Sequence, residues 1–270
     1  MNKFFDKTIN HIINYINEAV FYEIYAKEKG LLQSIEPRIK IISLLLLIVS
    51  SLMSKDIVSL LIFNIFAILL AHLSKIPILT YLKRIYFFIP IFAGLVAIPT
   101  LFNLVNPGAD AIVLLQNPHI SITYEGIRYF IIFVLRISTC ISYGILIPMT
   151  TEWNIVIGAL KKFKIPDEVI TLLNMSYRYI FLLLTETLNM MYSKKSRTVK
   201  KLGYMESWSE SAKSIGHLFI KTCSMGEEIY YGMLSRGGTT ISTYYDYKIT
   251  LKDILFLISI IIFIIIVWLL

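Results

Sequence analysis

The amino-acid sequence predicts an all-α, polytopic membrane protein with about five transmembrane helices and long amphipathic helices in the cytoplasm. The 270 residues have a mean hydropathy of +0.69, and 56% of them are hydrophobic. Only 16% are charged, compared with about 25% in a typical soluble domain. The apolar residues gather in runs suited to helices that cross a bilayer, and a long basic region interrupts these runs near the C-terminus.

The candidate spans are five apolar runs with polar connectors between them. They cover residues 39–53, 57–73, 85–105, 127–149 and 254–270. The first run is short, and it becomes long enough if Lys40 and Lys55 extend their charges to the two interfaces. The third contains Pro90, Gly94 and Pro99. These residues favour kinks, which are tolerated where neighbours satisfy the freed backbone groups.

The distribution of basic residues predicts the orientation of the spans, because cytoplasmic segments carry an excess of Lys and Arg. Basic residues gather in segment 1–38, in connector 74–84 and in region 150–251. The loop 106–126 contains neither Lys nor Arg. We therefore expect a cytoplasmic N-terminus, an outer 106–126 loop and an outer C-terminus. Only Lys55, in a short turn, then lies on the outer side against the rule.

The chain divides into four parts on this basis. They are an N-terminal cytoplasmic or interfacial segment (1–38), transmembrane helices 1 to 4 (39–149), a cytoplasmic region (150–251) and a C-terminal transmembrane helix (252–270). Helical spacing of apolar residues in the first thirty positions favours an interfacial or packing helix there. The net charge of +8 fits topology signals and lipid attraction, and not nucleic-acid binding.

The first long helix of the cytoplasmic region is expected to begin at Pro166 and to run to about Lys201. Proline suits the first turn, and the acidic Asp167 and Glu168 complement the positive end of the helix dipole. About 35 residues at 1.5 Å each reach about 50 Å, which exceeds a bilayer core. We therefore expect this helix to lie partly along the interface.

The second long helix has a start signal at Ser207 and Glu210, which have the spacing of a capping box. Apolar residues then recur at helical spacing. Gly237 and Gly238 supply the stop, because glycine adopts the left-handed conformation that closes many helices.

Both long helices end in a small residue followed by an arginine. The two triads are Ser196-Arg197-Thr198 and Ser235-Arg236-Gly237. A cation near a helix C-terminus is favourable to the dipole, which could explain one such arginine. Two matched ends favour a second role, because the arginine fork binds carboxylates and backbone carbonyls of a partner. A small serine allows that partner to approach closely.

These features coincide with further stretches that resemble a known family. The stretches are Glu36-Pro37-Arg38-Ile39-Lys40, Thr123-Tyr124-Glu125-Gly126, Thr150-Thr151-Glu152-Trp153, Ala159-Leu160, Ile165-Pro166 and Met175-Ser176-Tyr177-Arg178-Tyr179-Ile180-Phe181. With the two triads, they make residues 35–245 similar to the T component of energy-coupling factor (ECF) transporters, in particular the cobalt-type CbiQ subunit.

The resemblance implies a non-catalytic scaffold and transducer subunit of an ABC-type importer in a prokaryotic cell membrane. Its partners would be two ABC-type ATPase subunits and a separate substrate-binding membrane subunit. The chain would bind no cofactor or metal, and the ATP would be used by the partners. The family implies that both triads enter grooves on the ATPases. The family triad is usually Ala-Arg-Gly, so Thr198 departs from it, and we expect a looser helix end there.

Two further arginines are expected to have structural or coupling roles. Arg136 lies inside the fourth span, where a charge is costly unless it faces protein or water. We expect it to tie two helices together through a carbonyl freed by Pro90 or Pro99. Arg178 is expected to pin the two long helices, with Glu227 or Glu228 as its partner.

Other functions remain open at this stage. Cobalt is favoured by the resemblance, but nickel or a vitamin is an alternative substrate. An intramembrane lipid-modifying enzyme could use four acidic residues, Glu152, Asp167, Glu168 or Glu186, but these are scattered. A channel or carrier would need polar residues in several spans. The sequence has no Gly-Lys dipeptide and hence no Walker A loop. The four histidines and two cysteines show no metal-ligand spacing.

Overall fold

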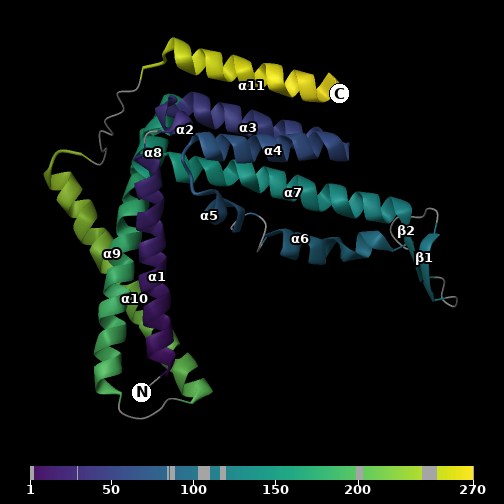
Figure 1. Cartoon of the computed structure of the whole chain (residues 1–270). Helices are drawn as coiled ribbons and strands as arrows, with labels where there is room; N and C mark the ends of the chain where they lie inside the picture. The colour runs from purple at the N-terminus through teal and green to yellow at the C-terminus, as the bar shows by residue number, and fades with distance from the viewer. Residues whose placement is uncertain are drawn as a thin grey trace. The chain divides into compact units, whose positions relative to one another are not determined.

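The structure is a computed structural model that describes residues 3–28, 30–83, 85, 89–102, 110–115, 120–198, 203–238 and 248–269. The helices group into two compact units (Figure 1). Unit 1 contains residues 1–22 and 153–245, and unit 2 contains residues 23–152 and 246–270. The expected N-terminal segment 1–38 is therefore shared between the two units.

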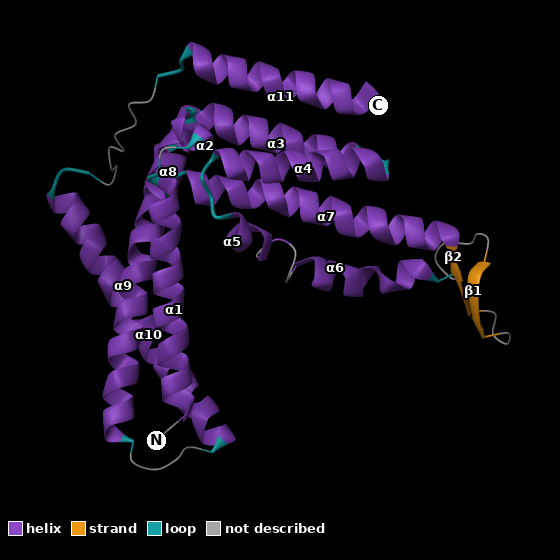
Figure 2. Cartoon of the chain, in the orientation of Figure 1, coloured by secondary structure: helices purple, strands orange, loops and turns teal. Residues whose placement is uncertain are grey.

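The elements in chain order are α1 (Lys3–Ala26), α2 (Leu31–Ser34), α3 (Pro37–Met53), α4 (Ile57–Leu73), α5 (Ile78–Leu82), α6 (Ile89–Ala97), the 3-10 helix η2 (Ile98–Leu101), β1 (Asp110–Leu115), β2 (Ile120–Thr123), α7 (Tyr124–Thr150), α8 (Trp153–Lys162), α9 (Asp167–Arg197), α10 (Tyr204–Ser235) and α11 (Leu251–Leu269). Figure 2 shows that most of these elements are helices. The predicted helical membrane fold is confirmed, with one short hairpin added.

Unit 2 contains the apolar helices of the membrane region. Helices α3 and α4 pack on α7, and α11 packs on α3. Four predicted spans correspond to α3, α4, α7 and α11, and the bounds of α4 are those predicted. Within the described residues, α7 and α11 are long and apolar enough to cross a membrane. Helix α4 and residues 91–101 are apolar but shorter.

The third predicted span is not one continuous helix. Residues 89–97 form α6, and the chain then continues as the 3-10 helix η2. Pro99 lies in the first turn of η2. Proline has no N–H for the helix ladder and its ring crowds the preceding turn, so an α-helix is interrupted there. The kink expected within the predicted span 85–105 is therefore found at Pro99, and residues 86–88 and 103–105 of that span lie outside the described residues.

The 106–126 loop contains secondary structure that the sequence analysis did not predict. Strands β1 and β2 pair antiparallel, with Asp110 opposite Thr123. At the end of β2, the Thr123 hydroxyl accepts a hydrogen bond from the N–H of Gly126, at 3.1 Å, and so caps α7. A Cβ on Gly126 would lie 2.7 Å from the Thr100 carbonyl oxygen. Glycine therefore allows α7 to begin in close contact with η2.

Unit 1 is built from α8, α9, α10 and most of α1. Phe5 and Ile9 of α1 form a buried cluster with Met191 of α9. Beside this cluster, the ammonium of Lys195 lies 2.5 Å from the carboxylate of Asp6. The N-terminal residues therefore form a packing helix, one of the two forms expected for them.

The two long helices of unit 1 start and end near their predicted positions. Pro166 is the N-cap of α9 and directly precedes its first helical residue. Helix α10 begins at Tyr204, so the start predicted at Ser207 is wrong. The Glu206 carboxylate accepts a hydrogen bond from the N–H of Gly203, at 2.9 Å, and this contact fixes the earlier start.

Candidate functional site

Both predicted arginines lie at exposed ends of the long helices. Arg197 is the last residue of α9, and Arg236 is the C-cap of α10. The serines before them donate hydrogen bonds back to their own helices, Ser196 to the Tyr192 carbonyl at 2.8 Å and Ser235 to the Gly232 carbonyl at 3.0 Å. Within the described chain, neither guanidinium has an ion-pair partner. Each is therefore available to a partner.

The two helix ends close in different ways. Gly237 has a φ of +91°, and its N–H donates to the Leu234 carbonyl at 3.1 Å. The predicted glycine stop is confirmed, because this conformation favours a residue without a Cβ. Thr198 has an extended backbone, and its N–H and hydroxyl both donate to the Lys194 carbonyl, at 3.0 and 2.7 Å. The expected loosening at Thr198 is thus not seen.

Helices α9 and α10 pair in an antiparallel direction. Near the end of α9, Lys194 Nζ donates to Glu210 Oε2 at 3.1 Å and to Ser214 Oγ at 2.8 Å. Further back along α9, Glu186 forms an ion pair with Lys221 of α10. Figure 1 shows the two helices crossing. Residues late in α9 thus meet residues early in α10, and earlier residues meet later ones.

The Glu210 carboxylate is contacted by lysines of both helices. It accepts hydrogen bonds from Lys213 on its own helix, at 2.8 Å, and from Lys194 on α9. These bonds, that of Lys213 first, hold the pKa of the Glu210 carboxyl below its ordinary value. The carboxylate therefore stays charged and holds Lys194 against α10 at neutral pH.

Arg178 lies beside the second arginine end. A cavity of about 500 Å³ is lined by Arg178 and Met175 of α9, and by Met233 and Arg236 of α10. The structure describes Glu227 and Glu228 but shows neither paired with Arg178, so that expectation is wrong. Their place on the helix explains this result. Helix α10 turns Ile229, Gly232 and Met233 toward the cavity, and residues one or two positions away lie on other faces.

The antiparallel pairing separates the two arginine ends. Arg236 lines the cavity with Arg178, and Arg178 precedes Arg197 by 197 − 178 = 19 residues on the same helix. At 1.5 Å per residue, the two ends are roughly 28 Å apart along α9. The unit therefore presents two distinct cationic ends on one helical body, and a single small ligand could not reach both.

Arg136 ties two helices of unit 2 together, as the sequence analysis expected, but through another carbonyl. Its Nη2 donates to the Ser54 carbonyl oxygen at 2.8 Å. The acceptor predicted near Pro90 or Pro99 is therefore wrong. Ser54 is the C-cap of α3, where carbonyls lack a partner within the helix. The guanidinium of α7 satisfies one of them.

Replacing Arg136 with leucine should destabilise the protein, because the Ser54 carbonyl loses its donor. A hydrogen bond from a charged donor contributes about 1.5–3 kcal/mol. Arg136→Lys keeps a charged donor and should cost less. Thermal denaturation of the purified protein in detergent would measure both, and an unchanged midpoint for Arg136→Leu would contradict the role.

Lys40 does not extend to an interface. Its side chain is buried, and Nζ donates to the Thr150 carbonyl at 3.1 Å and to Thr151 Oγ1 at 2.7 Å. The expected snorkelling is therefore wrong for Lys40, because the end of α7 supplies two acceptors for its ammonium. The bond joins the beginning of α3 to the end of α7. Lys40 belongs to one of the stretches that carry the family resemblance, and its two acceptors belong to another.

The acidic residues considered for an enzyme do not gather in one place. Asp167 lies 3.0 Å from Lys161, and Glu186 pairs with Lys221. Glu152 is half-buried and Glu168 is exposed. Within the described residues, no group of three His, Cys, Asp or Glu side chains could hold a metal ion.

The fold and the site define a class of protein: a helical membrane protein with a second helical unit that presents two arginine ends. The chain belongs to the CbiQ family, described as cobalt transport protein, whose model matches residues 28–245. The family predicted from the sequence is thereby confirmed.

Three relatives extend this result. An uncharacterized protein of Methanocaldococcus jannaschii is 58% identical over 95% of this chain and 88% of its own length. A second from the same organism is 29% identical over 76% of each chain. The energy-coupling factor transporter transmembrane protein EcfT of Streptococcus equi subsp. equi is 25% identical over 65% of this chain and 66% of its own.

Proposed function

We propose that this protein is the transmembrane scaffold and transducer subunit of an ECF-type ABC importer. It couples ATP hydrolysis by two partner ATPase subunits to uptake through a separate membrane subunit that holds the substrate. Membership of the CbiQ family and the similarity to EcfT support this proposal. The observation that carries it is the pair of exposed arginine ends, roughly 28 Å apart on paired helices. Two such ends suit two partner subunits, one at each end.

The geometry suits a mechanical role. Each guanidinium offers a planar fork of donors to carboxylates or helix-end carbonyls in a groove of an ATPase. The contacts of Lys194 with Glu210, and of Glu186 with Lys221, hold α9 and α10 together. When ATP draws the two ATPases together, a force applied at either end is carried by both helices. The chain itself performs no catalysis and binds no cofactor, and the ATP is held by the partners.

Cobalt ion is the proposed substrate, because the family is described as cobalt transport protein. Nickel or a vitamin is the alternative, and the substrate-binding subunit would decide between them. The protein would lie in the cell membrane of a prokaryote with its N-terminus and both arginine ends in the cytoplasm. The excess of basic residues in the predicted cytoplasmic segments supports that orientation.

Co-purification tests the proposed partners. We expect the tagged protein, extracted from membranes in mild detergent, to bring with it two ABC-type ATPase subunits and a small membrane subunit, identified by mass spectrometry. Arg197→Ala/Arg236→Ala should lose the ATPases and keep the membrane subunit, because its changes lie only at the helix ends. Absence of any ATPase from the wild-type sample would overturn the proposal.

A matched variant controls for the loss of two positive charges. Lys7→Ala/Lys162→Ala removes two exposed cations from the same unit but leaves both helix ends intact. It should retain the ATPases. Uptake of radioactive cobalt and nickel by cells that express the complete complex would then identify the ion. Uptake of neither would point to a vitamin.

A further inference from the structure

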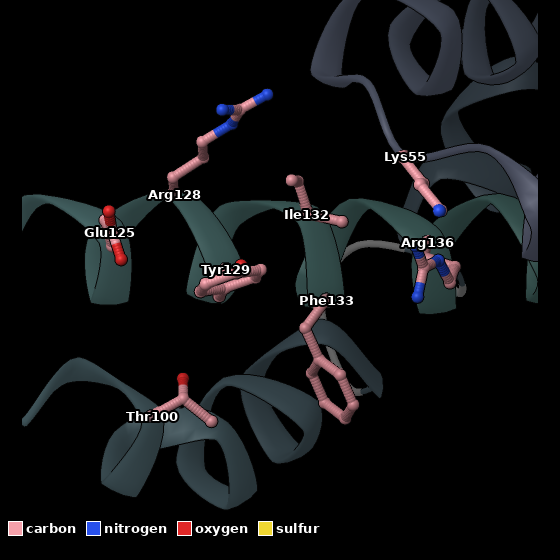
Figure 3. Close-up of a pocket in the computed structure, with 8 residues that line it drawn as sticks. All are labelled: Lys55, Thr100, Glu125, Arg128, Tyr129, Ile132, Phe133 and Arg136. Carbon is pink, nitrogen blue, oxygen red and sulfur yellow. The ribbon is translucent and has the colours of Figure 1, made fainter. Parts of the chain in front are cut away.

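A second cationic pocket lies in unit 2, whereas both arginine ends belong to unit 1. It has a volume of about 720 Å³ and lies between η2, α7 and the turn that joins α3 to α4. The turn contributes Lys55, and α7 contributes Arg128 and Arg136 (Figure 3). Among the described residues that line the pocket, Glu125 is the only one with a carboxylate. The described lining thus carries three positive charges and one negative charge.

The cations of this pocket are poorly neutralised by the protein. Arg128 lies 3.7 Å from Asp56, but both side chains are well exposed, so the pair is weak. Lys55 has no ion pair within the described chain, and its side chain points toward Arg136 in Figure 3. Like charges that line one pocket beside apolar helices repel one another, so an anion bound in that pocket would be stabilising.

Arg136 supplies an independent sign of a missing ligand. One nitrogen, Nη2, is satisfied by the Ser54 carbonyl. Its Nε is buried and has no hydrogen-bond partner among the described residues. Buried donors are nearly always satisfied, since an unpaired one carries the full cost of desolvation. An oxygen of a bound anion would satisfy this donor.

The remaining lining favours an amphiphilic anion. Tyr129, Ile132 and Phe133 of α7 also line the pocket. They place aromatic and aliphatic carbon beside the three cations, on a helix that is long and apolar enough to cross a membrane. A fully hydrated ion would gain nothing from these side chains. A phospholipid presents a charged phosphate next to apolar chains. The three cations of the pocket suit the phosphate, and its aromatic and aliphatic side chains suit the acyl chains.

We propose that this pocket binds the phosphate of an anionic phospholipid. The exposed side chains of Lys55 and Arg128 contact the phosphate at the mouth of the pocket. The buried Nε of Arg136 donates a hydrogen bond to it from the inside. Tyr129 and Phe133 contact the first carbons of the acyl chains. The lipid thereby bridges the α3–α4 turn and α7, which the protein itself joins through the bond from Arg136 to Ser54.

Native mass spectrometry of the full-length protein in detergent would measure this binding with two probes, phosphatidylglycerol and the zwitterionic phosphatidylcholine. We expect wild type to prefer phosphatidylglycerol. Lys55→Gln/Arg128→Gln should lower that affinity about tenfold, because each cation near an anionic lipid contributes substantially. Both side chains are exposed, so the variant should fold normally. Glu125→Gln removes the repelling carboxylate and should raise the affinity severalfold.

Lys248→Gln/Lys252→Gln is the matched control. It removes two exposed cations from the same unit, before and within the first turn of α11. It should leave the affinity unchanged. An equal loss in this control would show general charge attraction and overturn the pocket. Equal binding of phosphatidylglycerol by wild type and Lys55→Gln/Arg128→Gln would also overturn the proposed site. Displacement of the lipid by millimolar inorganic phosphate would assign the site to the free ion and overturn the lipid proposal.

Discussion

Substrate uptake should fall to the level of cells without the ATPases when Arg197 and Arg236 are both replaced with alanine. Each arginine is exposed, and no residue of the described chain pairs with it. Its removal therefore leaves the fold of unit 1 intact and takes away only the group offered to a partner. A charged, bidentate contact buried in a groove contributes about 2–5 kcal/mol. The loss of two such contacts, at least about 4 kcal/mol together, lowers the affinity for the ATPases by at least about 700-fold.

Single variants make this prediction sharper. If the two ends serve two ATPases that act together, Arg197→Ala and Arg236→Ala should each lower uptake at least about tenfold. Arg→Lys at either position should be intermediate, since lysine keeps the charge but loses the fork. Radioactive cobalt uptake and ATP hydrolysis by the purified complex should be measured together. Normal uptake by the double alanine variant would overturn the assignment of these ends.

The apolar helices were predictable because hydropathy alone decides where they lie. Residues 57–73 form a helix with the predicted bounds, and the other three spans differ by a few residues at their ends. In a bilayer, each spanning segment must satisfy its own backbone, so a run of apolar residues is nearly always a helix. The end of α10 at Gly237 was predictable for a similar reason. It depends on one residue, since the positive φ of Gly237 is favoured by the absence of a Cβ.

The polar contacts were not predictable in the same way. The acceptors of Lys40 lie more than one hundred residues away in the sequence, at Thr150 and Thr151. The donor to the Ser54 carbonyl likewise comes from a distant helix. The sequence marks such residues as unusual, because a lysine or arginine in an apolar run needs a partner. Which partner it finds depends on how the helices pack, and no local pattern contains that.

The arginine ends also combine a predictable feature with one that depends on how the helices pack. Both triads and their helices were predictable from apolar spacing and end signals. Their separation was not, because it follows from the antiparallel pairing that places Arg236 near Arg178. The long-range contacts of Lys194 and Glu186 determine that pairing. The sequence analysis named Glu227 or Glu228 as the partner of Arg178, but α10 turns Ile229, Gly232 and Met233 toward that arginine instead.

Asp253 was also missed, and its removal should strongly destabilise the protein. Its carboxylate is buried at the start of α11 and accepts two sets of hydrogen bonds. Oδ1 accepts from the N–H of Glu36, the N-cap of α3, at 2.8 Å. Oδ2 accepts from the N–H and the hydroxyl of Thr250, at 2.8 and 2.6 Å. One side chain thus begins α11 and joins it to the first span.

Asp253→Ala takes the Oδ1 acceptor away from the buried N–H of Glu36 and removes the cap of α11. The bond to a charged acceptor contributes about 1.5–3 kcal/mol, and a lost cap adds about 1 kcal/mol. We therefore expect a loss of about 3 kcal/mol in the free energy of unfolding, measured by titration of the purified protein with denaturing detergent. Asp253→Asn keeps one acceptor for Glu36 and should lose less.

Glu228→Ala is the control, because Glu228 is an exposed acidic residue and surface changes of this kind stay within about 0.5 kcal/mol. If Asp253→Ala unfolds at the same detergent concentration as this control, the carboxylate does not hold α11 to α3. If Asp253→Asn loses as much as Asp253→Ala, the charge contributes more than the bond to Glu36. The comparison thus separates a helix cap from a tie between the first and last spans.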